Sequence, residues 1–124
     1  MHYIGKINLE IYRCISEDIR TDEVIITDER IQHIKERHPQ DFERFCGYME
    51  QIVENPDYII EANKPKTALI LKSFDDCIPF KTVLRLVTSS DSDEIKNSII
   101  TFMKIDEKEW KRLIKNKKVL YKRE

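Results

Sequence analysis

Residues 27–39 read TDERIQHIKERHP, and this segment predicts the first helix of the fold. Thr27 and Asp28 offer an N-cap, and an acidic first turn suits the positive end of a helix dipole. Pro39 disfavours helical geometry at the residue before it. We therefore expect a helix that begins near Asp28 and ends at His38.

The segments around this helix predict an α+β fold. Period-two alternation within residues 5–15 and the apolar run 24–26 indicate strands, and the apolar stripe of residues 41–54 indicates a second helix. The remainder predicts four antiparallel strands (58–62, 67–73, 81–88 and 97–105) and a helix from 107 to about 115. The expected order is an N-terminal strand and two helices, followed by a four-stranded antiparallel sheet and a C-terminal helix.

Length and composition restrict the possible functions. The 124 residues suit one domain, in which residues 1–23 form an N-terminal extension with a strand. Lys and Arg total 22 and Asp and Glu total 23, so nucleic acid would have to bind through a local patch. The only glycines, Gly5 and Gly47, exclude a Rossmann fingerprint and a glycine-rich phosphate loop. No signal peptide or membrane span is evident, so we expect a cytoplasmic protein.

The spacing of the metal-binding residue types argues against a metal site. Cys14, Cys46 and Cys77 are widely spaced and odd in number, which is typical of buried, reduced thiols rather than of a disulfide framework. His33 and His38 are five residues apart, so their side chains diverge by roughly 140° on a helix. We therefore expect no bound metal and no cofactor.

Several polar residues are candidates for chemistry. His38 continues the inward face of the first helix at its C-terminus, where the helix dipole favours imidazolium and burial favours the neutral ring. Such a histidine suits acid–base catalysis, and the alternative is a structural histidine bonded to backbone carbonyls.

Arg85 interrupts the apolar strand 82–87, which suggests phosphate recognition; the alternatives are an edge strand or an ion pair with a helix carboxylate. Lys64, Lys66 and Lys72 also offer charge for phosphate, although solvated surface roles are the default for lysine. Strict alternation along residues 97–102 puts Ser98 on the face of Phe102 and puts Thr101 on the other face.

These segments together resemble the phage-associated barnase/EndoU/colicin/RelE-like (BECR) nuclease domains. The resemblance runs from about Glu23 to the C-terminus and is carried by residues 25–39, by NPDYI at 55–59 and by NSIITF at 97–102. It implies helices followed by a four-stranded antiparallel sheet, and an RNase from a phage or mobile element. It also implies a catalytic His38 with Arg85 and Thr101 lining the site, and gives weaker roles in substrate binding to His33, Arg37 and Ser98.

The function expected from the resemblance is metal-independent RNA cleavage. The 2′-OH would attack the adjacent phosphorus and give a 2′,3′-cyclic phosphate, with Lys64 or Lys72 assisting Arg85 at the phosphate. RNA is the expected partner, and a toxin-like role would add an immunity or antitoxin protein. The sequence does not identify a second acid–base group. The alternative is a non-catalytic accessory module that binds RNA or protein, which the near-zero net charge favours.

Overall fold

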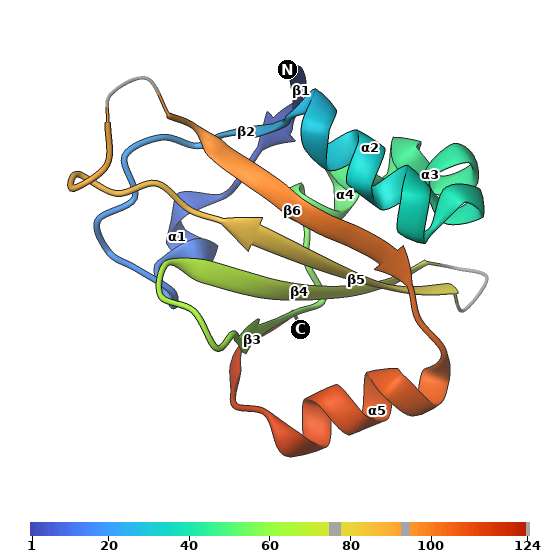
Figure 1. Cartoon of the computed structure of the whole chain (residues 1–124). Coiled ribbons are helices and arrows are strands. Elements are labelled where there is room, and N and C mark those ends of the chain that lie inside the picture. Colours follow the sequence, from blue (N-terminus) through green and yellow to red (C-terminus); the bar gives the residue numbers. More distant parts are fainter. Residues whose placement is uncertain (75–77, 93–94, 124) are drawn as a thin grey trace.

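The computed structural model describes residues 1–74, 78–92 and 95–123, and they form one sheet with helices on both faces (Figure 1). The strands are β1 (His2–Lys6), β2 (Glu23–Ile26), β3 (Tyr58–Glu61), β4 (Thr67–Phe74), β5 (Ile78–Arg85), β6 (Asn97–Lys104) and β7 (Val119–Lys122). The helices are α1 (Leu9–Tyr12), α2 (Asp28–Arg37), α3 (Pro39–Phe45), the 3₁₀ helix η1 (Cys46–Tyr48), α4 (Met49–Glu54) and α5 (Glu107–Asn116). The α+β class is confirmed.

The sheet has seven strands in the order β1-β2-β6-β5-β4-β3-β7. The four antiparallel strands expected from the sequence are present as neighbours, β3 to β6. The sheet is nevertheless larger than expected and mixed, because β2 pairs with β6 in parallel and β1 and β7 add to the two edges. These additions make β5 a central strand.

The N-terminal segment differs from the prediction. A strand was expected within residues 5–15, but β1 ends at Lys6 and the chain turns into the short helix α1. The side chain of Asn8 caps α1 by accepting a hydrogen bond from the backbone N–H of Glu10 at 3.0 Å. Ile7 and Ile11 are four residues apart, so their spacing fits a helical turn as well as a strand.

Helix α2 follows the prediction, and the second helix does not. The Thr27 hydroxyl accepts from the backbone N–H of Arg30 at 3.2 Å, and α2 ends at Arg37. In place of one helix from Asp41 to Glu54, the chain forms α3, η1 and α4. Gly47 lies in η1, and the low helix propensity of glycine accounts for an interruption there.

Two apolar cores lie on opposite faces of the sheet. The larger core packs α2, α3 and α4 on one face, where Phe80 stacks on Phe102 with ring centroids 5.3 Å apart. The smaller core lies under α5 and includes Leu69 and Leu113. Because α5 is short, it covers only part of its face (Figure 1).

The two described cysteines differ from the prediction in burial, although both are free thiols. Cys14 and Cys46 are exposed, because each follows the end of a short helix where the chain turns at the surface. Cys77 and the expected strand break at Asp75 and Asp76 lie outside the described residues. No helix in the described part of the chain is long and apolar enough to cross a membrane.

Candidate active site

One half of a sheet face is left open by α5. Side chains of β5 alternate, so that Phe80 and Leu84 enter the larger core while Lys81 and Arg85 point to the opposite face. Lys81 lies at the end that α5 covers and pairs with Glu109 of that helix at 3.9 Å. Arg85 lies at the other end of β5, where the face stays open.

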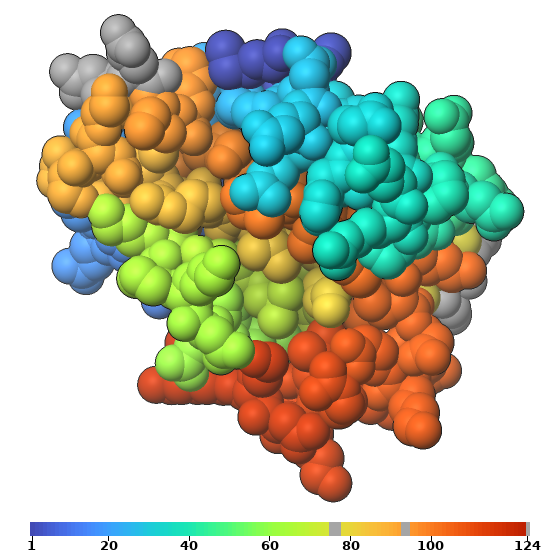
Figure 2. Space-filling model, in the orientation of Figure 1, coloured from blue at the N-terminus to red at the C-terminus, as the bar shows by residue number. Residues whose placement is uncertain are grey.

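A cavity of about 650 Å³ occupies this open end. Figure 2 shows the hollow between α2 in cyan, the yellow-green loop that joins β3 to β4, and α5 in red. The cavity is lined by Arg30 of α2, Val83 and Arg85 of β5, Ile100 of β6 and residues 62–67 of the loop. This volume is in the usual range for small-molecule sites. It is larger than a single phosphate group requires.

Three strands carry a row of polar residues, of which Thr67 and Arg85 line the cavity and Ser98 does not. Thr67 of β4 pairs with Arg85, and Arg85 pairs with Ser98 of β6. Residues directly opposite one another on neighbouring strands have side chains on the same face. Ser98 and Thr67 therefore flank the base of the Arg85 side chain.

A β-bulge in β6 changes which side chains join this row. Leu84 pairs with Ile99 and Val83 pairs with Thr101, so Ile100 is an extra residue on β6. Strict alternation placed Ser98 and Thr101 on opposite faces, and that expectation is wrong. The extra residue brings Thr101 to the face of Arg85 and Ser98, and sends Phe102 into the larger core.

The Arg85 side chain is 37 % exposed, and the contacts described for its guanidinium are with residues that follow β5. Its guanidinium donates to the carbonyl of Leu86 and lies 3.3 Å from a carboxylate oxygen of Asp91. The backbone N–H of Thr88, helped by the charges of Lys66 and Arg85, holds the pKa of Asp91 below its ordinary value. The carboxylate that pairs with Arg85 thus comes from a turn, whereas the alternative interpretation of the sequence placed it on a helix.

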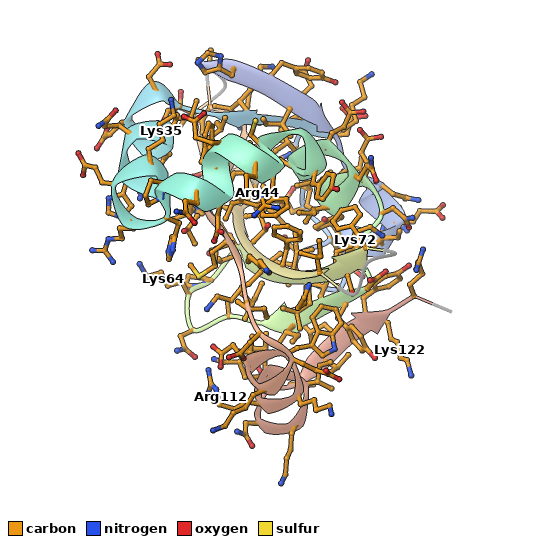
Figure 3. The ribbon with its side chains drawn as sticks, turned by 90° about the vertical axis from the view of Figure 1, so that its right-hand side faces the viewer. Lys35, Arg44, Lys64, Lys72, Arg112 and Lys122 are labelled. Carbon is orange, nitrogen blue, oxygen red and sulfur yellow. The ribbon has the colours of Figure 1, made fainter. Side chains whose placement is uncertain are left out.

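The loop over the cavity is fixed at Lys66. This residue has a φ of 58°, in the left-handed region that non-glycine residues rarely adopt. Its carbonyl accepts from the backbone N–H of Leu86 at 2.8 Å, and its ammonium lies 2.6 Å from the Ser90 hydroxyl and 3.5 Å from Asp91. These contacts hold the loop against the turn after β5, with Lys64 exposed beside the cavity, on the left in Figure 3.

Helix α2 supplies the opposite wall. Arg30 lines the cavity and also a neighbouring pocket of about 310 Å³ that includes His33. Arg37 continues this stripe, since residues at i, i+3 and i+7 share one side of a helix. Among the ion pairs between described residues, none involves Arg30 or Lys64, so both cations are available to a ligand.

A family model described as "phage-Barnase-EndoU-ColicinE5/D-RelE like nuclease2" matches residues 1–122. The chain belongs to this nuclease family. Comparison with curated proteins and with solved structures gives no match. The resemblance drawn from residues 25–39 is therefore confirmed, and the family match begins at residue 1 instead of Glu23.

Membership in this nuclease family does not by itself assign catalytic residues, and the structure separates the two candidate histidines. His38 is half-buried at the junction of α2 and α3, where its backbone N–H donates to Ile34 at 2.6 Å and its carbonyl accepts from Phe42. His38 is not among the residues that line the cavity. His33 lies in the pocket that shares Arg30 with the cavity.

Lys72 does not fit the expected role at the phosphate. It pairs with Phe80, which places it on the helix-covered face, opposite to Arg85. Its ammonium is buried, 3.4 Å from Asp57 and over the ring of Phe74. Figure 3 shows Lys72 on the right, away from Lys64.

Two further points about the candidate site concern metal ions and Arg30 of α2. Within the described residues, no group of three or more His, Cys, Asp or Glu side chains has an arrangement that suits a metal ion. Sequence reasoning also missed Arg30 as a site residue. The signal available was its position three residues before His33, which places both on one side of α2.

Proposed function

We propose that this member of the nuclease family is a metal-independent endoribonuclease whose active site is the cavity beside Arg85. The observation that carries the proposal is the gathering of cations around one cavity of nucleotide size. Arg30 and Arg85 face it from a helix and a strand, and Lys64 and Lys66 face it from the loop. In a family of nucleases, such a cavity suits the phosphodiester of a substrate.

Arg85 is assigned to the scissile phosphate. Its guanidinium is oriented by Asp91 and Leu86 and keeps a solvent-reachable edge. A planar guanidinium contacts two phosphate oxygens at once, which a lysine cannot reproduce. Because Arg85 is already held in place, it stabilises developing negative charge without first reorganising.

The reaction requires no metal. The RNA 2′ oxygen attacks the adjacent phosphorus while its proton passes to a base, and the bond from phosphorus to the 5′ oxygen breaks. The leaving 5′ oxygen takes a proton from Lys64 or from water. The products are a 2′,3′-cyclic phosphate and a free 5′-OH. DNA has no 2′-OH and is not cleaved.

We assign the base to His33. The free ring nitrogen of a neutral imidazole can accept the proton of the 2′-OH. The pocket of His33 adjoins the cavity through Arg30. Ser98 and Thr101, on the same sheet face as Arg85, supply hydroxyls for non-bridging phosphate oxygens.

The test is cleavage of a single-stranded RNA oligonucleotide in EDTA, with mass analysis of the fragment ends. We expect ends that carry a 2′,3′-cyclic phosphate. The matched control is the same oligonucleotide with one 2′-deoxy sugar, which should stay intact at that position. Cleavage that requires added divalent metal, or that cuts the deoxy position equally, would overturn the mechanism.

One observation favours a non-catalytic RNA-binding module. The described residues that line the cavity are cations and neutral groups, with no histidine, aspartate or glutamate among them. This candidate expects an uncleavable 2′-O-methyl oligonucleotide to bind while the matched RNA stays intact. The cleavage assay and the binding assay together therefore decide between the two functions.

A further inference from the structure

A second hollow of about 410 Å³ lies on the other side of the β3–β4 loop. It shares residues 62–67 with the cavity beside Arg85, so this loop is a common wall between the two. The far wall of the second hollow consists of Lys118 and Leu120, with Cys14 and Ile15 from the turn that follows α1. No residue of β5 or β6 lines it.

The far wall is fixed in position by the sheet. The carbonyl of Lys118 accepts a hydrogen bond from the backbone N–H of Glu61 at 2.9 Å, just before β7 pairs with β3. Lys118 is exposed, and Figure 2 shows the yellow-green loop directly above the red C-terminal segment. A cationic side chain thus stands across the loop from the proposed active site.

We propose that this second hollow binds the nucleotides next to the cleaved one, so that an RNA strand crosses the loop from Arg85 to Lys118. The inference rests on the proposed function. Two adjoining hollows with a shared wall suit successive units of one polymer. Lys64 and Lys66 line both hollows, and Lys118 extends the same charge beyond the loop.

The charge balance of the second hollow favours a polyanion. Among the described residues that line it are three lysines, Lys64, Lys66 and Lys118, and one carboxylate, Glu61. Lys66 is also paired with Asp91, so Lys64 and Lys118 carry the excess charge. The molecule as a whole has a net charge of −1, so this concentration of cations is local. Local basic grooves that follow the backbone are the usual means of binding single-stranded nucleic acid.

The second hollow also suggests a role for one of the lysines in the basic C-terminal segment. Lys118 lies in the second hollow, whereas Lys122 at the end of β7 lies on the right in Figure 3, away from Lys64. The two lysines are close in sequence and both are exposed. They form a matched pair for an experiment.

The experiment compares Lys118→Ala with Lys122→Ala on two substrates, a dinucleoside monophosphate and a decanucleotide RNA. We expect Lys118→Ala to lower kcat/KM about tenfold on the decanucleotide, the usual effect of losing one charged hydrogen bond. On the dinucleoside monophosphate it should have no effect, because that substrate does not reach the second hollow. Lys122→Ala should match the parent on both substrates.

Equal losses on both substrates, or an equal loss from Lys122→Ala, would overturn the subsite. Failure of the parent to cleave either RNA would contradict the proposed function and leave the subsite to a binding assay. In that assay, fluorescence anisotropy follows a 2′-O-methyl decanucleotide. Weaker binding by Lys118→Ala than by Lys122→Ala supports the subsite, and equal binding overturns it.

Discussion

Arg85 combines a stem in a central strand with a guanidinium that opens into the cavity. Arg85→Lys keeps the charge and loses the two-oxygen contact, so we expect cleavage to fall about 100-fold, the scale for losing one preorganised donor. The measurement is kcat/KM on a single-stranded RNA. The control is Lys81→Arg, on the same strand and face but under α5, which should leave cleavage unchanged. An Arg85→Lys variant that cleaves like the parent would refute the assignment.

His33 lies in α2 and His38 is the C-cap of that helix, and we expect a catalytic role for the first and a structural role for the second. We expect His33→Ala to lower kcat about 100-fold or more, because the variant lacks the base. We expect His38→Ala to keep most activity and to lower the melting temperature, since His38 is half-buried where two helices meet. The reverse pattern would return the catalytic role to His38.

The sequence predicted Arg85 as an anomaly because a guanidinium in an apolar strand needs a polar partner or a ligand. It did not predict the partner, since Asp91 reaches Arg85 only through the fold of the turn after β5. For Lys72 the sequence suggested a site role that the fold does not support. Its charge suggested phosphate binding. The register of β4 instead places its side chain on the helix-covered face, where it pairs with Asp57.

The turn after β5 holds Arg85 and Lys66 through one carboxylate. Because the pKa of Asp91 is lowered on folding, its contribution to stability is complete above the ordinary carboxyl pKa of about 4 and disappears as the pH falls through the lowered value. We therefore expect the stability difference between the parent and Asp91→Asn to be constant from pH 7 to 5 and to shrink below pH 4. Urea unfolding at each pH measures it, and a difference that changes between pH 7 and 5 would contradict the cause.

The start of β6 is fixed by one buried amide. The Asn97 side chain donates to the carbonyls of Thr21 and Glu23 at 2.7 and 3.0 Å and accepts from the backbone N–H of Val87 at 2.8 Å. Asn97→Ala leaves these groups without a partner, so we expect a loss of about 3 kcal/mol in the free energy of unfolding. Urea denaturation tests this, with Ser98→Ala as the neighbouring control. A loss no larger than that of the control would show that water replaces the amide.

The elements differ in how far their sequences determine them. Helix α2 was predictable because its signals, Thr27 at one end and Pro39 at the other, are local. Which residues of β6 face the core was not predictable, since either Ile99 or Ile100 could supply the apolar side chain there. Strand β7 was not predicted either, because its pairing with β3 depends on how α5 packs.

The whole molecule carries almost no net charge, so binding of RNA depends on the cations that line the cavity beside Arg85. If about three phosphates are neutralised, log K for single-stranded RNA falls against log salt with a slope of about −2. Arg30→Ala should reduce the slope by about 0.7. Fluorescence anisotropy with a 2′-O-methyl oligonucleotide across a salt series checks both values. A slope that Arg30→Ala leaves unchanged would remove Arg30 from the site.

The assembly of the site could not be read from the sequence for a physical reason. Arg30, Lys64 and Arg85 belong to a helix, a loop and a strand, and they meet only because α5 leaves one end of the sheet uncovered. Local patterns predict elements, whereas the uncovered area depends on the length and placement of a helix that contributes no residue to the cavity.

The bulge in β6 also determines which changes of chain length this strand can absorb. Removing one of the two adjacent isoleucines would leave a strand of regular alternation, with Thr101 still on the open face and Phe102 still in the core. A deletion elsewhere in the strand would exchange the two faces for every residue beyond it. Natural variants one residue shorter at Ile99–Ile100 should therefore fold, but they would lack the Ile100 wall of the cavity and so differ in the ligand they accept.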